Sequence, residues 1–265
     1  MKNRKQSGFT LVEIAIVLVI IGLLLGGILK GQQLINSARV RNMADQNSGV
    51  QAAYYGFIDR YRQVPGDMPA ATACTSITVN VDPNCGGAPT IGGNQNGRID
   101  QWTEAGAIWA HLSAAGFLNG SFSGSTANAA AYEIGVPQGV VPGNAFQQPI
   151  FLGYSNDYEN GVAAGTVRLL FTFGAGSSAS LLRELDVKLD DGQPGTGVVR
   201  ATLSAAVAGE AVLGGIDFAA GGTAGSEIIL WNAGFGPVCI NGAGAANSTW
   251  NVDSDNVRCN AAFIY

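Results

Sequence analysis

The sequence predicts an α+β protein in which one long N-terminal helix is followed mainly by β-strands and large loops. Apolar residues recur at steps of three, four and seven as far as Tyr61, which indicates one continuous helix. Gly- and Ala-rich segments dominate the remainder, and the chain has 38 glycines among 265 residues. Between these segments lie four strand-like runs, at residues 149–154, 166–173, 197–207 and 227–231.

A basic, polar stretch precedes the apolar run that begins the helix. Residues 1–8 read MKNRKQSG, and residues 9–29 are apolar except for Thr10 and Glu13. About 20 apolar residues cross a bilayer as a helix, and a basic flank stays on the cytoplasmic side. The rest of the chain is therefore expected on the periplasmic or outer side.

Three interpretations of this run compete. A secretory signal peptide needs a small-residue cleavage site after a shorter apolar core, and no good A-x-A site follows here. A simple membrane anchor gives no reason for Glu13, because an acid in the bilayer costs about 2.5–3.5 kcal/mol on insertion scales. The third interpretation assigns that acid a role in assembly.

Gly8-Phe9-Thr10-Leu11-Val12-Glu13 resembles the G-F-T-L-x-E signature of prepilins, the precursors of type IV pilins and pseudopilins. The resemblance implies that a prepilin peptidase cuts after Gly8 and methylates the new amino terminus of Phe9. It also implies a dry filament core in which the Glu13 carboxylate pairs with the Phe9 amine of a neighbouring subunit. Each buried charge then offsets the cost of burying the other.

The resemblance further implies the fold, the domains and the partners. The implied fold is pilin-like, a long N-terminal α-helix packed on an antiparallel β-sheet with large loops. The implied domains are a leader (1–8), a helix (9–62, with 9–29 in the membrane or filament core) and a globular domain (63–265). The implied partners are the prepilin peptidase/methyltransferase, other pilin or pseudopilin subunits and the inner-membrane assembly platform.

The implied location is a single pass of the inner membrane, with the N-terminus cytoplasmic and the body periplasmic, and then a pilus, a pseudopilus or the cell surface.

Many major pilins carry a helix-kinking proline in the apolar run, and residues 9–29 have none. We therefore expect a minor subunit of a type IV pilus or type II secretion pseudopilus. The alternative is a membrane-anchored adhesin or ligand-binding protein that uses aromatic residues such as Trp231 and Trp250 at its surface, although core packing is the default role of these tryptophans.

The helix is expected to continue well beyond the apolar run. Val64-Pro65-Gly66 ends it, because proline disfavours a helical conformation in the preceding residue. Residues 9–62 would form a helix about 80 Å long at 1.5 Å per residue. A strict heptad is not sustained, so packing on a sheet is favoured over a coiled coil.

Four cysteines and one histidine limit the metal and redox chemistry of the chain. Zinc sites need more ligands at tighter spacing, so the cysteines are expected to form two disulfides in an oxidising compartment. Three pairings exist. We favour Cys74 with Cys85 and Cys239 with Cys259, since each closes a local loop rich in Gly and Asn. The second loop is similar to the disulfide-bounded C-terminal loop of many pilins.

The globular part is expected to begin with a loop region at 63–100. A helix at 102–116 follows, with Ile108, Trp109, Leu112 and Ala115 facing inward and His111 as a surface or packing residue. A second helix is expected at 179–188.

Two patterns suggest small-ligand binding. Residues 174–179 (GAGSSA) fit a dinucleotide fingerprint, but no second strand is expected to complete a βαβ unit, so a tight turn is favoured. Asn94, Asn96 and Asp100 resemble the alternate oxygen ligands of a calcium loop, although a polar turn with Asp100 or Thr103 as helix cap explains them as well. Asp190 and Asp191 are a second calcium candidate, because some pseudopilins bind calcium in late loops; a tight turn is the simpler explanation.

Charge and motif content exclude other functions. The net charge is -5, and removal of the leader would leave 11 basic against 19 acidic side chains, so broad nucleic-acid binding is not expected. The sequence contains no Ser-His-Asp set, Cys-His pair or P-loop. The chain is therefore expected to be a peptidase substrate and a structural subunit, with no cofactor unless it binds calcium.

Overall fold

The computed structural model describes most of the chain after residue 10. The described residues are 11–124, 139–160, 166–174, 176–204, 212–213, 215–216, 229–230, 239–242, 247–254 and 259–265. The chain divides into two compact units, Met1–Arg39 and Val40–Tyr265. Helix α1 (Leu11–Tyr61) runs through both, as the sequence predicts.

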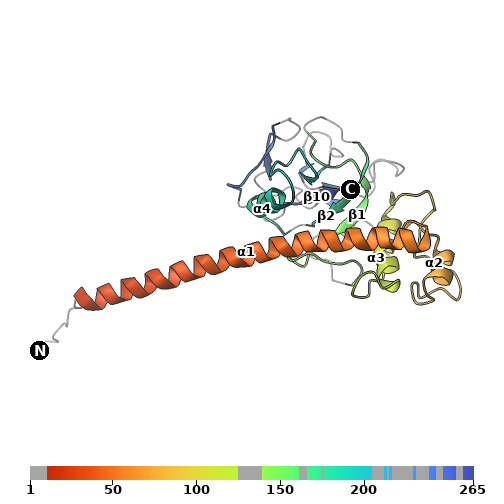
Figure 1. Ribbon diagram of the computed structural model, residues 1–265, viewed down its shortest axis with the longest axis horizontal. Helices are drawn as coiled ribbons and strands as arrows, with labels where there is room; N and C mark the ends of the chain where they lie inside the picture. The colour runs from red at the N-terminus through yellow and green to blue at the C-terminus, as the bar shows by residue number, and fades with distance from the viewer. Residues whose placement is uncertain are drawn as a thin grey trace, which may run out of the picture. The chain divides into compact units, whose positions relative to one another are not determined.

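In its described residues, the second unit contains the rest of α1, three further helices and ten strands (Figure 1). Its helices are α2 (Ala70–Ser76), α3 (Trp102–Ala114) and α4 (Ala179–Leu189). Its strands are β1 (Phe151–Ser155), β2 (Arg168–Thr172), β3 (Val199–Ala201), β4 (Leu203–Ser204), β5 (Val212–Leu213), β6 (Gly215–Ile216), β7 (Ile229–Leu230), β8 (Ile240–Asn241), β9 (Thr249–Trp250) and β10 (Ala261–Ile264).

The central sheet has four strands in the order β1-β2-β10-β3, and every neighbouring pair is antiparallel. Phe171 on β2 pairs with Leu152 on one side and with Phe263 on the other. Three two-stranded sheets, β4-β5, β6-β7 and β8-β9, accompany it. The predicted α+β class, with a long helix and an antiparallel sheet, is therefore confirmed.

One face of the second half of α1 belongs to the core. Its buried residues are Val40, Met43, Asn47, Val50, Ala53, Tyr54 and Phe57. Their steps of three and four keep them on one side of the helix. Phe57 stacks on His111 of α3, with ring centroids 6.2 Å apart. The helix ends at Tyr61, just before Arg62, whose φ of 54° lies in the left-handed region.

Several sequence expectations need correction. Residues 63–100 contain α2, which at seven residues is too short to show helical periodicity. The predicted strand at 197–207 is interrupted between β3 and β4, where Thr202 forms an isolated bridge with Tyr158. Among the described strands, β7, in the predicted run 227–231, pairs with β6. The central strand β10 was not predicted.

Helix α3 follows the prediction closely but is capped differently. Ile108, Trp109 and Leu112 are fully buried, and Gly116 just past the helix has a φ of 80°. The N-cap is Gln101, without a side-chain cap bond, so neither Asp100 nor Thr103 caps the helix. Glu104 in the first turn instead accepts the Asp100 amide through Oε2 at 2.9 Å.

Candidate functional site

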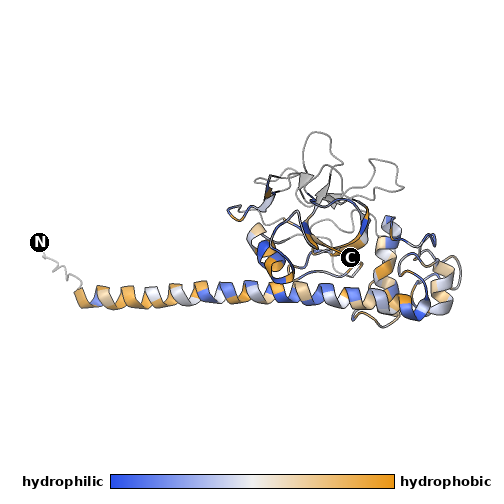
Figure 2. Cartoon of the chain, turned by 45° about the horizontal axis from the view of Figure 1, so that its top comes forward, coloured by the Kyte–Doolittle hydropathy of each residue, from blue (hydrophilic) through white to orange (hydrophobic). Residues whose placement is uncertain are grey.

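The first turns of α1 expose a continuous apolar surface. All the large apolar side chains from Leu11 to Leu29 are exposed, from 45% at Ile21 to 90% at Leu11. Figure 2 shows this stretch as nearly uninterrupted orange. Within the described residues, α1 is the one helix long and apolar enough to span a membrane, with a mean hydropathy of 2.8 over 18 residues. Such a surface needs a bilayer or neighbouring helices to cover it.

Glu13 is the acidic residue in the first turn of α1. This position suits a carboxylate, because the helix N-terminus carries partial positive charge. Ile16 and Val17, three and four residues further on, share its side of the helix and are about half exposed. Gly8 and Phe9, the predicted cleavage and methylation residues, lie outside the described residues.

Two disulfides join Cys74 to Cys85 and Cys239 to Cys259, and no described cysteine is free. The first ties α2 to the following loop across 11 residues. The second spans 20 residues and links the start of β8 to the residues before β10. Cys259 is fully buried, and its amide donates to the Ser177 carbonyl at 3.0 Å. This bond anchors the second disulfide beside the central sheet.

The loop at 94–100 is built around two carboxylates from outside the loop. Asp67 accepts the Asn96 amide at 3.1 Å and the Gly97 amide at 2.6 Å. Glu104 accepts the amides of Asn94 and Asp100. The sequence could not identify Asp67, because it lies about 30 residues before the turn that it organises.

The proposed ligand oxygens of this loop already accept hydrogen bonds. The side-chain oxygen of Asn94 accepts the Asn96 amide, and that of Asn96 accepts the Arg98 amide, each at 2.9 Å. The Asn96 side-chain amide also donates to Asp100 Oδ2 at 2.9 Å. These are self-contained polar turns. The polar turn that the sequence offers as the alternative is therefore present, and calcium binding at residues 94–100 stays a prediction.

Glu104 is fully buried under this loop. Burial raises its pKa to about 7, although the two amide hydrogen bonds lower it, and the Asp100 and Asp67 carboxylates raise it further.

His111 is also fully buried, which lowers its pKa to about 4. Its Nδ1 accepts the Gly66 amide at 3.0 Å, so Nε2, 3.1 Å from the Ile91 carbonyl, is the donor. His111 is thus a packing residue.

The GAGSSA segment joins β2 to α4. A strand parallel to β2 does follow α4, because β2 and β3 are both antiparallel to β10, but β10 lies between them and they do not pair with each other. However, a Cβ at Gly174 would lie 2.5 Å from the Pro149 carbonyl, and one at Gly176 would lie 2.7 Å from Phe146 Cβ. The protein itself occupies the space beside both glycines, which favours a tight turn.

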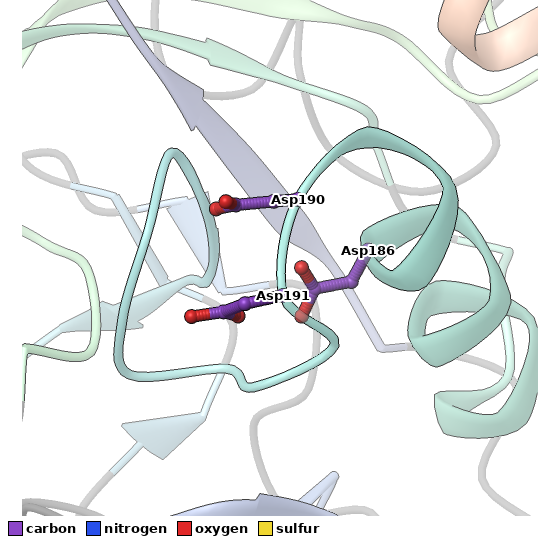
Figure 3. Close-up of side chains that lie close together, drawn as sticks. All are labelled: Asp186, Asp190 and Asp191. Carbon is purple, nitrogen blue, oxygen red and sulfur yellow. The ribbon is translucent and has the colours of Figure 1, made fainter.

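Three aspartates meet where α4 ends. Oxygen atoms of Asp186, Asp190 and Asp191 all lie within 4.8 Å of one another, in the one such group of acidic, His or Cys side chains in the described part of the chain. Figure 3 shows Asp186 reaching from the end of α4 toward the loop that carries Asp190 and Asp191. Asp186 lies four residues before Asp190, about one helical turn, and this spacing could have identified it.

Asp186 is the buried member of this aspartate cluster. Its Oδ2 accepts a 2.8 Å hydrogen bond from the indole nitrogen of Trp250. Burial raises the pKa of Asp186 to about 7, against the lowering effect of the Trp250 bond and the Gly192 amide. Trp250 is itself 4% exposed, so it is a core residue and not a surface aromatic. Trp231 lies outside the described residues.

Comparison with protein families identifies one match, to the prokaryotic N-terminal methylation motif, over residues 3–29. The match covers residues 3–8 of the basic leader, including Gly8, together with Phe9, Glu13 and the exposed apolar turns of α1. No curated protein and no solved structure matches the chain. The likeness to known proteins therefore rests on the N-terminal motif, together with an architecture consistent with the pilin fold.

Proposed function

We propose, from the premise that residues 3–29 form an N-terminal methylation motif, that this type IV pilin-like precursor matures into a structural filament subunit. Cleavage after Gly8 and methylation of Phe9 would produce the mature amino terminus. The globular unit from Val40 onward would be held outside the cytoplasm and carried into the filament by the first half of α1.

The exposed apolar surface of α1 is the observation that carries this proposal. A run from Leu11 to Leu29 with its large side chains 45% or more exposed cannot remain in water. It can lie in the inner membrane before assembly and against identical or related helices afterwards. Both environments are apolar, so the subunit can pass from one to the other without exposing the segment to water.

Glu13 would supply the register. In a filament core its carboxylate would pair with the methylated Phe9 amine of a neighbouring subunit. Misaligned neighbours would leave both charges buried and unpaired, at a cost of several kcal/mol. The pair would therefore select one helix offset, which a purely apolar surface cannot do.

We assign the chain to the accessory class of subunits. Residues 9–29 contain no proline that would kink the helix, and about 200 residues follow α1 in a loop-rich body. Such a body suits a minor pilin or pseudopilin better than a repeating shaft subunit. The type II secretion pseudopilus and the type IV pilus are both compatible with it.

The test is to express the full chain in a bacterium that has a prepilin peptidase and an assembly platform. Mass spectrometry of the mature protein should find methylated Phe9 as the first residue. Gly8→Ala should be cleaved better than Gly8→Val, because the peptidase requires a small residue there. Gly22→Val is the control, since it adds the same bulk further along the helix, where nothing lies within 4 Å.

Sheared filament preparations test whether the cleaved chain assembles into filaments. Shearing should release the cleaved chain together with other pilin subunits. A cleaved chain that stays in the membrane as a monomer, and is absent from sheared filaments, would contradict the subunit role and favour the anchored adhesin. An uncleaved chain would contradict the whole proposal.

A further inference from the structure

We propose that the globular unit binds a neutral saccharide in a pocket between the C-terminal end of α3 and the loop that follows α2. The pocket has a volume of about 310 Å³, at the small end of the range of about 300–1,000 Å³ that ligand sites occupy. Its walls are the loop at 78–81, the last turns of α3 from Ala110 to Ala114, and the segment at 120–122 that follows α3. Such a site goes beyond filament assembly and does not depend on it.

The pocket is lined by neutral polar groups that can both donate and accept hydrogen bonds. Thr78 Oγ1 accepts the Asn80 backbone amide at 3.4 Å, so its hydroxyl hydrogen is available to a ligand. Ser113 Oγ donates to the Ala110 carbonyl at 3.2 Å, so its lone pairs are available. Asn80 and Ser121 add a side-chain amide and a hydroxyl from exposed positions. A sugar hydroxyl also donates and accepts, so this mixed set of groups matches it.

The charge of the lining disfavours ionic ligands. None of its described residues is acidic or basic, so no carboxylate is present there to hold a metal ion and no cation to hold a phosphate. The wall that α3 contributes is its C-terminal end, where the partial negative charge of the helix disfavours an anion. The pocket therefore selects a neutral polar molecule.

Phe122 and the base of the pocket supply the apolar contacts that a sugar ring needs. Val81 and Ala110 form the base and are 4% and 2% exposed, and Phe122 is half-buried in the wall. The C–H groups of a sugar ring are apolar and slightly positive, whereas the face of an aromatic ring is negative. A sugar can therefore place C–H groups against Phe122 while its hydroxyls reach the polar side chains.

Both sides of the pocket are held in place by the fold. The Cys74–Cys85 disulfide closes the loop that forms one wall, and Asp82, 1% exposed, accepts three backbone amides between residues 84 and 91. On the other side, Gly120 has a φ of 113°, and a Cβ there would lie 3.1 Å from Phe122 Cζ, so the ring rests against this glycine. Walls that are already ordered reduce the entropy lost on binding.

The rim of the pocket is open, which favours the terminal unit of a longer glycan over a free sugar. Asn80, Gly120 and Ser121 are exposed, whereas Val81 and Ala110 are buried. A saccharide seated on the buried base can therefore extend past the three exposed residues into solvent. A disaccharide should bind at least as tightly as the monosaccharide at its non-reducing end, and tighter binding of the free monosaccharide would overturn the assignment to a glycan.

Saturation-transfer NMR on the purified full chain tests the site. The probes are galactose, glucose, mannose and N-acetylglucosamine, each with a disaccharide that carries it at the non-reducing end, in a zwitterionic detergent without a sugar headgroup. At least one neutral sugar should give a saturable signal from its ring protons. Its Kd should be insensitive to salt, because no ionic contact is involved. N-acetylneuraminic acid, an anionic sugar, should give no saturable signal.

Two matched pairs of variants connect the signal with the pocket. Asn80→Ala should weaken binding by about 3- to 10-fold through loss of a neutral hydrogen bond, whereas Asn119→Ala, at an asparagine outside the lining, should leave the Kd unchanged. Ser121→Trp should fill the pocket and abolish binding, whereas Ser123→Trp, two residues further on and outside the lining, should retain it. All four positions are exposed, so an unchanged Tm should show that each variant is folded.

Three outcomes would overturn the proposal: no saturable signal from any neutral sugar, equal binding of N-acetylneuraminic acid, or a signal that survives Ser121→Trp. The measurement uses the purified chain, so it depends on neither cleavage after Gly8 nor assembly. A negative result would therefore leave the filament proposal standing, and a failure of cleavage would leave the saccharide site standing.

Discussion

The hydroxyl group of Tyr265 donates a hydrogen bond to Asn47 Oδ1 at 2.9 Å, across 218 positions of sequence. Tyr265 directly follows β10, and Asn47 lies on the buried face of α1. The bond therefore fastens the central sheet to the helix that crosses it. Burial raises the pKa of Tyr265, so its hydroxyl remains a donor at physiological pH.

Tyr265→Phe should destabilise the globular unit by about 1–2 kcal/mol, because the nearly buried Asn47 side chain loses its donor. Urea unfolding of the full chain in detergent, followed by tryptophan fluorescence, measures the change. Tyr55→Phe is the matched control: Tyr55 is 51% exposed on the same helix, and its loss should cost less than about 0.5 kcal/mol. Equal effects at both positions would refute the role of the Tyr265 bond.

Glu13→Ala should leave cleavage after Gly8 intact but reduce incorporation into filaments. If the neighbouring amine is buried without its partner, the cost is about 3 kcal/mol or more, roughly a hundredfold loss. Quantitative immunoblots of sheared filaments and of the membrane fraction give the ratio. Asp45→Ala removes an acid from an exposed position of α1 in the globular unit and should incorporate normally. Wild-type incorporation of Glu13→Ala would remove the register role.

Gly197→Ala should destabilise the protein by about 2–3 kcal/mol. A Cβ at Gly197 would overlap Oδ2 of Asp190, and its φ of 68° is unfavourable for alanine. Gly97→Ala is the control, because its φ is 85° but nothing lies within 4 Å, so it carries only the backbone cost of about 1 kcal/mol. The difference between the two unfolding free energies reports the steric contact with Asp190. Equal costs would show that the contact relaxes freely.

The elements that the sequence predicts well are those with a local signal. In helices α1 and α3, apolar residues recur at helical spacing, and a residue that ends a helix follows: Pro65 after α1 and Gly116 after α3. Strand β10 escaped prediction because Ala261–Ile264 is a short run whose place in the sheet depends on pairing with β2 and β3, far away in sequence.

The candidate site residues likewise fall into those that local sequence identifies and those that only tertiary contacts identify. Glu13 stands out because it interrupts an apolar run, and the motif around it is contiguous. Asp190 and Asp191 were visible as a pair, but the importance of Asp186 depends on its burial against Trp250, 64 residues later. The spacing of Asn94–Asp100 shows the alternate oxygen side chains but not the tertiary contacts from Asp67 and Glu104 that shape the loop, so calcium binding there stays a prediction.

The pKa of the His111 imidazole tests whether this side chain is buried. It is the one histidine in the sequence, so its imidazole resonances in an NMR titration need no assignment. The pKa should lie near 4, because protonation would charge a buried ring and remove the acceptor of the Gly66 amide. A value near 6.5 would show that solvent reaches the ring.

The same shift makes stability depend on pH. In the unfolded chain the histidine titrates near 6.5, so between pH 6.5 and 4 the unfolded state binds more protons than the folded state. The contribution of His111 to the free energy of unfolding is therefore complete above pH 6.5 and is lost as the pH falls, by about 3 kcal/mol at most. Glu104, with its raised pKa, acts in the opposite direction over part of this range. Comparing wild type with His111→Gln, which keeps a donor and an acceptor but does not titrate, isolates the histidine. The urea unfolding free energy of wild type minus that of His111→Gln should fall steadily from pH 7 to pH 4. A difference independent of pH would contradict the neutral, buried imidazole.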